Sequence, residues 1–382
     1  MKPIARGPSI TVAKRAAIEK IKEVSSRTPG AIRLESGVPD FPTPEHIIEA
    51  ASKAARGGFT KYTLSAGFLT LRELIADKLA RVNKLQVTPD NVTVAAGGAN
   101  AIAATLIALV DNGDEVLVPD PAWPCYAEQI RCIPGAVLKT YSLAFERGFL
   151  PDIAELEERV SDRTKVLIVN SPSNPLGAVF PGDLIRELVE FAQRHDLYLL
   201  SDEPYEELVF EGEHVSAATF DSERVVSCFS FSKTYAMTGW RLGYAVAPKE
   251  ISNAITLTVL PLVSCATSVS QKAGEAALSG PQDCVRIMRD SYRDRRDAAI
   301  GVLAKHGVPV CEPKGAFYLW FDISRSGLGS TDFALRLLEE KQVAVRPGDR
   351  LSEYPNSYVR VSLATEKGAL IEGLERICSL LE

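Results

Sequence analysis

The chain has 382 residues, a mass of 41.4 kDa and a net charge of −6, with 46% hydrophobic and 24% charged residues. This composition is typical of a globular protein and excludes a disordered chain, a collagen-like repeat and a small disulfide scaffold. The slight acidic excess provides no basic surface for a phosphate backbone, so we expect no nucleic-acid partner.

Cysteine, histidine and hydropathy patterns predict a cytoplasmic protein. The seven cysteines are scattered and form no Cys-x-x-Cys pair, as expected for reduced thiols. The four histidines include no close pair, so we expect no metal site. Residues 1–21 lack the apolar segment and cleavage site of a signal peptide, and no run approaches the roughly 20 apolar residues of a membrane span.

Short apolar strands alternate with helical segments over the first two thirds of the chain. The segment 183–195, for example, carries apolar residues at helical spacing. The strands are nearly continuous runs of Val, Ile, Leu and Ala, which is typical of strands buried on both faces of a sheet. This order predicts an α/β fold with a mostly parallel, helix-covered sheet, with strands at residues 92–95, 116–119, 165–170, 197–201, 224–229 and 244–247.

The C-terminal third has a different pattern. Long charged helices, expected at 284–306 and 331–341, alternate with short strands at 317–322, 343–346 and 358–363. This pattern predicts a second, smaller α+β domain. We therefore expect three parts: an N-terminal segment (1–37) that packs with the small domain, a large domain (38–275) and a small C-terminal domain (276–382).

Polar residues follow five of the expected parallel strands at the point where each strand ends. In open α/β sheets, ligands bind beyond the carboxyl ends of the strands. The sequence therefore predicts a site built from residues 97–100, 120–123, 171–177, 202–205 and 230–233.

Each candidate residue also has an ordinary structural interpretation. The turn at Gly98 either binds an anion at a helix N-terminus or only connects a strand to a helix. Asp202 either pairs with a cationic ring nitrogen, or it caps a helix or forms a structural ion pair. Lys233 is either a surface charge or an enclosed amine whose pKa is lowered by lost hydration. Arg241 suits a phosphate, and Arg360 either grips a carboxylate or lies exposed on an edge strand.

The segment 230–244 (Ser-Phe-Ser-Lys-Thr-Tyr-Ala-Met-Thr-Gly-Trp-Arg-Leu-Gly-Tyr) resembles the lysine signature of fold type I pyridoxal-phosphate enzymes, in the class I/II (aspartate aminotransferase-like) group. Other stretches resemble motifs of the same family across nearly the whole chain: 37–44, 62–72, 174–177 (Asn-Pro-Leu-Gly) and 202–205 (Asp-Glu-Pro-Tyr). The resemblance implies that the large domain binds pyridoxal 5′-phosphate and that the protein is a homodimer with shared active sites.

The resemblance also implies a role for each matching residue. Lys233 would hold the cofactor as a Schiff base and move the Cα proton, and Asp202 would pair with the protonated pyridine nitrogen. Tyr205 and Asn174 would bind the ring oxygen, and Trp123 would stack on the ring. The substrate α-carboxylate would be bound by Arg360, Asn174 and Gly37. The phosphate would be bound by Gly98, Ala99, Asn100, Ser230, Ser232, Arg241 and Tyr62 of the partner subunit.

The expected reaction is transfer of an amino group between an L-amino acid and a 2-oxo acid by a ping-pong mechanism. Some aspartate-type family members use a lysine where this chain has Ala99, and others use an arginine in the segment matching 257–264, which has no basic residue here. Neither position offers a partner for an acidic side chain. We therefore expect a neutral, apolar or aromatic substrate.

Three alternatives remain at this stage. The first is another pyridoxal-phosphate reaction on the same fold, either β-elimination or oxidative chemistry, because the motifs only describe how the cofactor is held. The second is a regulatory module that senses the cofactor; such modules are usually fused to a DNA-binding domain, and no helix-turn-helix fits the sequence before Gly37. The third is a nucleotide-binding doubly wound domain, but the sequence contains no Gly-x-Gly-x-x-Gly motif.

Overall fold

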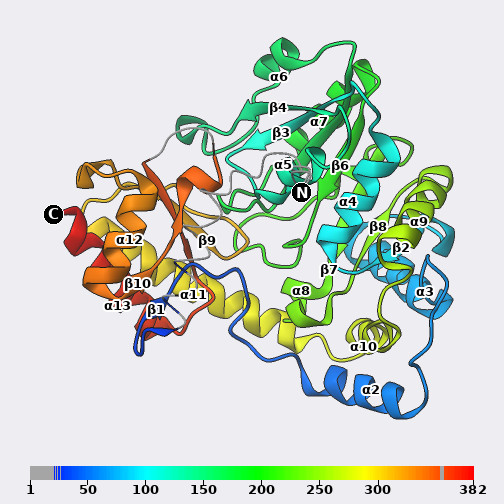
Figure 1. Ribbon diagram of the computed structural model, residues 1–382, viewed down its shortest axis with the longest axis horizontal. Coiled ribbons are helices and arrows are strands. Elements are labelled where there is room, and N and C mark those ends of the chain that lie inside the picture. Colours follow the sequence, from blue (N-terminus) through cyan, green and yellow to red (C-terminus); the bar gives the residue numbers. More distant parts are fainter. Residues whose placement is uncertain (1–20, 22, 24, 26, 353–356) are drawn as a thin grey trace, which may run out of the picture.

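The computed structural model describes residues 21, 23, 25, 27–352 and 357–382. Figure 1 shows a large sheet covered by helices, with a smaller group of strands and helices beside it that contains the C-terminus. The fold is therefore α/β, as the sequence predicts.

The large sheet has seven strands in the order β2-β8-β7-β6-β5-β3-β4. All neighbours are parallel except β8, which is antiparallel to both β2 and β7. Six strands lie within a residue or two of the predicted positions, whereas β4 was not predicted. The strands are β2 (Val92–Ala95), β3 (Glu115–Asp120), β4 (Val137–Ser142), β5 (Thr164–Asn170), β6 (Tyr198–Asp202), β7 (Val225–Ser230) and β8 (Gly243–Val246).

Both faces of this sheet are buried by helices. Along β5, Val166 and Ile168 pack into the cluster that contains α4 and α9, while Leu167 and Val169 pack into the cluster that contains α7. This alternation explains why the strand is apolar throughout. The helices associated with the sheet are α2 (Glu45–Arg56), α3 (Leu69–Lys78), α4 (Gly98–Leu109), α5 (Cys125–Ile130), α6 (Ile153–Arg159), α7 (Gly182–Arg194), α8 (Phe231–Thr234), α9 (Lys249–Val263) and α10 (Ser268–Ser279).

The smaller region contains a three-stranded antiparallel sheet in the order β11-β12-β9 and a separate parallel pair, β1 with β10. Of the predicted N-terminal segment 1–37, residues 1–20, 22, 24 and 26 lie outside the described residues, and strand β1 from its end pairs with this region. The elements are β1 (Ile32–Arg33), β9 (Tyr318–Asp322), β10 (Val343–Ala344), β11 (Arg346–Pro347), β12 (Tyr358–Ser362), α11 (Asp283–Lys305), α12 (Ser330–Lys341) and α13 (Lys367–Leu381).

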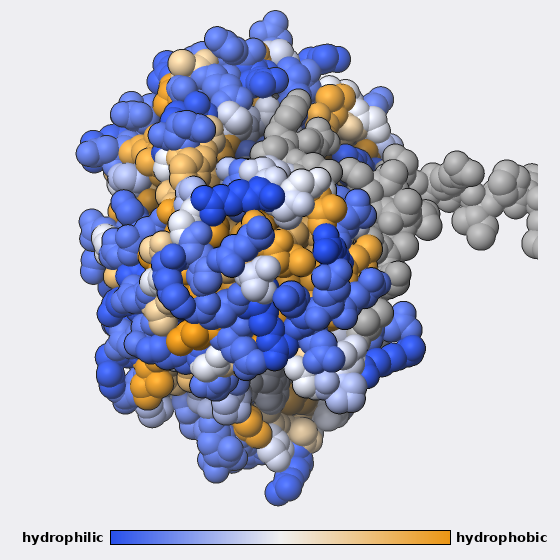
Figure 2. All heavy atoms as spheres, turned by 90° about the vertical axis from the view of Figure 1, so that its left-hand side faces the viewer, coloured by the Kyte–Doolittle hydropathy of each residue, from blue (hydrophilic) through white to orange (hydrophobic). Residues whose placement is uncertain are grey.

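The surface of this smaller region is largely hydrophilic. Figure 2 shows the face at the left of Figure 1, where polar side chains surround small groups of apolar ones. Within the described part of the chain, no helix combines the length and apolarity needed to cross a bilayer.

Candidate active site

A cavity of about 400 Å³ lies at the carboxyl ends of the parallel strands. It gathers residues that are far apart in the chain, from Arg33 to Arg360. Two predicted site residues do not line it: Asn100, whose side-chain oxygen accepts from Ala96 N at 3.0 Å, and Tyr62, which is 87% exposed. The predicted residues that do line it are Gly37, Gly98, Ala99, Trp123, Asn174, Asp202, Tyr205, Ser230, Ser232, Lys233, Arg241 and Arg360.

Lys233 lies on the short helix α8, directly after β7. Its Nζ donates a hydrogen bond to Gly37 O at 2.5 Å and lies 5.7 Å from the ring centre of Phe317. Burial lowers the pKa of this amine to about 8, and the positive charges of Arg360 and Arg241 contribute to the same shift. About a tenth of the amine is therefore unprotonated and nucleophilic at pH 7, far more than for an exposed lysine.

Asp202 ends β6 and is buried at 5% exposure. The Tyr126 hydroxyl donates a hydrogen bond to its Oδ2, and no cationic side chain of the described residues forms an ion pair with it. Burial raises the pKa of this carboxyl to about 7; the bond from Tyr126 opposes the shift, and the charge of Glu203 adds to it. The carboxylate is therefore suited to a cation that enters the cavity from outside.

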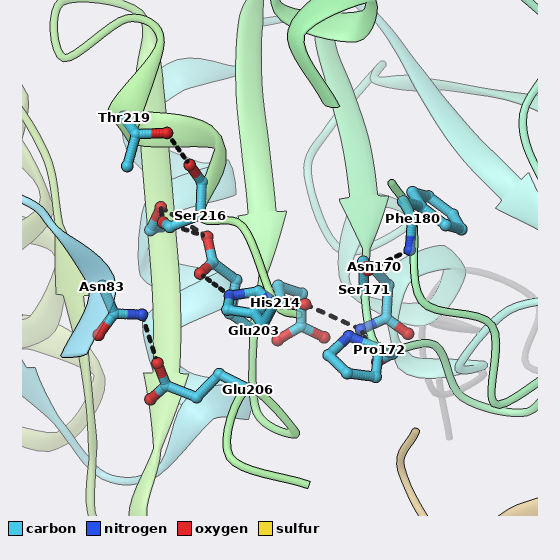
Figure 3. Close-up of polar contacts among 12 residues, drawn as sticks. Asn83, Asn170, Ser171, Pro172, Phe180, Glu203, Glu206, His214, Ser216 and Thr219 are labelled. Atoms are coloured by element: carbon cyan, nitrogen blue, oxygen red, sulfur yellow. Dashed lines mark hydrogen bonds and ion pairs between the residues drawn. The ribbon is translucent and has the colours of Figure 1, made fainter. Parts of the chain in front are cut away.

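Glu203 follows Asp202 directly but does not line the cavity. Figure 3 shows its carboxylate directed toward His214 and Ser216. His214 Nε2 lies 2.8 Å from one oxygen, and Ser216 and Ser227 donate to the other at 3.0 and 2.9 Å. Burial alone would lower the pKa of His214, but the bond to Glu203 raises it. Of the two adjacent acids, only Asp202 is therefore available to a ligand.

An anion site forms where α4 begins. The turn requires Gly97, whose φ is 91°, and a Cβ there would lie 2.6 Å from Arg241 Nη2, so the guanidinium rests against the glycine. Gly98 and Ser230 line the cavity beside it. Unpaired backbone N–H groups of a helix N-terminus, a serine hydroxyl and an arginine together suit a phosphate.

Arg360 lies on β12, the middle strand of its sheet, so the alternative of an exposed edge position is wrong. Its Nη1 donates to Asn174 Oδ1 at 2.9 Å and its Nη2 to Glu35 O at 2.8 Å, with the guanidinium 4.2 Å from the Tyr318 ring centre. Its Nε is buried and has no hydrogen-bond partner among the described residues. This buried, incompletely paired cation suits a carboxylate ligand.

Three aromatic or acidic residues contact the predicted site although the sequence motifs did not indicate them. Tyr126 bonds Asp202, and the Tyr318 hydroxyl lies 3.0 Å from that of Tyr205. Glu35 lines the cavity. Tyr126 also meets Trp123 edge to face at 5.3 Å, but Trp123 precedes α5, so helical spacing did not predict this contact.

Comparison with known proteins gives consistent matches. The sequence pattern of the family "Aminotransferase class I and II" matches residues 29–377. The aspartate/prephenate aminotransferase of Thermus thermophilus is 39% identical over 380 residues, covering 99% of this chain and 97% of that protein. A solved single mutant of Thermus thermophilus aspartate aminotransferase is 37% identical, with a TM-score of 0.94 over 100% of both chains. The aromatic aminotransferase of Pyrococcus horikoshii OT3 is 36% identical, with a TM-score of 0.89 over 94% of this chain and 98% of that one.

Proposed function

The chain belongs to the aminotransferase class I and II family and performs transamination, and we propose that it does so with pyridoxal 5′-phosphate bound in the cavity described above. This proposal rests on two ionisable side chains that line one cavity, a base whose pKa is lowered and an acid whose pKa is raised. Lys233 has a lowered pKa, and Asp202 is a buried acid with no ion-pair partner among the described residues. Such pairs of perturbed groups cluster at functional sites.

The residues present fit this cofactor. Lys233 would hold it through the amine, and Asp202 would stabilise a proton on its ring nitrogen. The anion site at Gly98, Ser230 and Arg241 would hold its phosphate. Around the ring, we propose hydrogen bonds from Asn174 and Tyr205 and stacking on Trp123; Ala99 and Ser232 would complete the phosphate site. Asn100 is not part of it, because its N–H donates to Gly97 O at 3.1 Å and its side chain is bonded to Ala96 N. When bound, the cofactor supplies an electron sink for the charge left on the substrate Cα.

The chain's own residues then provide binding and proton transfer. Arg360 and Asn174, with the Gly37 backbone, would orient the α-carboxylate of each substrate. The Lys233 amine, when it is not bound to the cofactor, would take the Cα proton as a general base and return it as a general acid. Because the relatives are aminotransferases, elimination and oxidative chemistry are not favoured.

We further propose that the preferred amino acid has a neutral, apolar or aromatic side chain. Part of the cavity wall is apolar and consists of Val38, Ala99, Ile102, Trp123 and Leu351. The cavity also contains two arginines that the sequence patterns did not indicate, Arg33 and Arg346. Arg33 is already bonded to Glu35 at 2.8 and 3.0 Å, which offsets its charge.

A half-reaction panel tests this proposal. Purified enzyme loaded with cofactor is mixed with single amino acids, and the cofactor absorbance is followed. We expect leucine, phenylalanine or methionine to convert one cofactor per active site without continued ammonia release, because transamination stops when no 2-oxo acid is present. Much faster reaction of aspartate would contradict the substrate preference, and repeated turnover with ammonia would contradict transamination.

We also propose a homodimer with shared active sites. Tyr62 and Leu64 are 87% and 73% exposed, and Leu257 and Leu260 on α9 are 70% and 52% exposed. The loop that carries Tyr62 is held to the segment after α9, where Thr63 N donates to Cys265 Sγ at 3.4 Å. Exposed apolar side chains on neighbouring segments suit an interface with a second copy of the chain.

Replacing Tyr62 by phenylalanine tests the shared site. We expect cofactor affinity to fall about 10- to 100-fold, because a hydroxyl bond to a charged phosphate contributes about 1.5–3 kcal/mol. Affinity is measured by titrating cofactor-free enzyme, and light scattering checks that the dimer persists. Tyr198→Phe, on β6 away from the cavity, is the matched control. Equal affinity in both variants would argue against a contribution of Tyr62 to the neighbouring site.

A cytoplasmic location is proposed on the cysteine chemistry. All seven cysteines carry free thiols, and Cys228 and Cys378 are buried. Free thiols persist in a reducing compartment.

A further inference from the structure

Glu35 lines the cavity but has no role in the chemistry proposed above. The residue is 4% exposed. Its Oε1 accepts two hydrogen bonds from Arg33, from Nε at 3.0 Å and from Nη2 at 2.8 Å. Its Oε2 is buried and has no hydrogen-bond partner in the described part of the chain. Leaving a buried polar atom unsatisfied costs about 1–3 kcal/mol, so this oxygen suits a donor that arrives with a ligand.

Strand alternation directs Glu35 into the cavity. Ile32 and Leu34 pack into the core of the smaller region, whereas Arg33 and Glu35 line the cavity. Strand β1 is held in place by its parallel pairing with β10, and Leu34 N donates to Ala344 O at 2.8 Å. Glu35 itself lies two residues beyond β1 (Ile32–Arg33), directly after Leu34, whose N–H and carbonyl are both bonded to the smaller region.

The backbone around Glu35 contacts both ends of the proposed reaction centre. Glu35 O accepts from Arg360 Nη2 at 2.8 Å, and Gly37 O accepts from Lys233 Nζ at 2.5 Å. A Cβ on Gly37 would lie 2.6 Å from the Tyr318 hydroxyl, so this backbone is closely packed. Glu35 thus lies beside Arg360, the residue proposed to bind the substrate α-carboxylate, and both line the same cavity.

The charges around Oε2 limit the type of side chain that fits. A carboxylate would be repelled by Glu35, and an ammonium group would meet Arg33 and Arg346, which line the same cavity. A neutral group that both donates and accepts hydrogen bonds satisfies Glu35 and an arginine together.

We propose that Glu35 and Arg33 form a side-chain subsite of the active site that binds a hydroxyl or carboxamide group of the substrate. This inference rests on the proposed aminotransferase function and deepens it: among neutral side chains, those that also carry a hydroxyl or carboxamide group are favoured over their apolar analogues. In this subsite Glu35 Oε2 accepts from the substrate, and Arg33 positions the carboxylate.

Matched substrate pairs test the subsite. Three pairs differ only in a hydroxyl at increasing distance from Cα: homoserine with 2-aminobutyrate, 5-hydroxynorvaline with norvaline, and tyrosine with phenylalanine. We expect kcat/KM to favour the hydroxyl member of at least one pair by about 10-fold or more, because the analogue leaves a buried acceptor unpaired. In Glu35→Val this ratio should fall to about 1, because valine offers no acceptor to the substrate hydroxyl.

Three further measurements separate a subsite from a purely structural role. Glu35→Gln keeps an acceptor oxygen, so part of the ratio should return. Glu35→Val also leaves Arg33 unpaired, so kcat/KM for glutamate relative to norvaline should rise at least several-fold. Binding without reaction is compared by calorimetry with 3-(4-hydroxyphenyl)propanoate and 3-phenylpropanoate on the cofactor-loaded enzyme.

Failure of the subsite and failure of the function give different results. If no amino acid reacts, the proposed function fails, and calorimetry still decides whether Glu35 recognises a hydroxyl. If amino acids react but all three wild-type ratios are near 1, the subsite is overturned. A hydroxyl preference that persists unchanged in Glu35→Val overturns it as well, and if that variant does not fold, Glu35→Gln and the wild-type ratios decide.

Discussion

Replacing Lys233 by alanine is expected to reduce transamination by at least about 10⁴-fold, which is the upper range for loss of one positioned proton-transfer group. The variant lacks both the amine that would hold the cofactor and the base that would move the Cα proton. Arg360 and Arg241 remain, so amino acids and phosphate should still bind. The rate is measured as cofactor absorbance change after mixing with phenylalanine in a stopped-flow instrument.

A surface lysine provides the control for this variant. Lys249 is 66% exposed and pairs with Asp90 at 2.9 Å, so Lys249→Ala should leave the rate within about 2-fold. Borohydride should fix the cofactor to wild-type protein and to Lys249→Ala but not to Lys233→Ala. Because the pKa of Lys233 is about 8, the free amine fraction falls as the pH drops below that value, and cofactor capture by cofactor-free enzyme should slow about tenfold per pH unit. Near-normal turnover by Lys233→Ala would contradict the proposed roles of Lys233 in holding the cofactor and moving the Cα proton.

Replacing Asp202 by asparagine is expected to lower kcat by about 10²–10³-fold, as when one preorganised electrostatic group is removed from an active site. The amide has the same size and still accepts from the Tyr126 hydroxyl, but it cannot stabilise a positive charge on the ring nitrogen. Pre-steady-state measurement of the half-reaction gives the effect on the chemical step. Cofactor content is measured in parallel, so that weaker binding is not mistaken for slower chemistry.

Stability distinguishes this effect from damage to the fold. Burial raises the pKa of Asp202 to about 7, so ionising this group costs free energy in the folded protein near neutral pH. A neutral amide should therefore leave the melting temperature of the cofactor-free protein unchanged or slightly higher. Tyr126→Phe removes only the hydrogen bond and should have a smaller effect on kcat, about 10-fold. Wild-type kcat in Asp202→Asn would contradict a charge role for this carboxylate.

The two adjacent acids at the end of β6 have different surroundings and therefore different roles. Asp202 lines the cavity, and Glu203 is held on the other side by His214, Ser216 and Ser227 (Figure 3). The buried Glu203 charge contributes to the raised pKa of Asp202. This arrangement increases the tendency of Asp202 to bind a cation, which is what the proposed ring nitrogen supplies.

The sequence by itself determined the parallel core and its main chemical groups. Strands β5, β6 and β7 are nearly continuous apolar runs because both of their faces are buried, and such runs are recognisable without coordinates. Lys233 and Asp202 follow such strands directly, so local order along the chain places them at one edge of the sheet. Strand β4 was missed because it is an edge strand, partly exposed, with the polar residues Lys139 and Thr140.

Only the tertiary structure decided which groups meet Lys233 and Arg360. Their partners Gly37 and Glu35 are 196 and 325 residues away in the chain, and no spacing rule connects them. The antiparallel placement of β8 and the orientation of Glu35 toward the cavity also depend on the packing of distant segments. A polar atom is satisfied or left unpaired by what surrounds it in three dimensions, so the unpaired oxygen of Glu35 became visible only when the chain was folded.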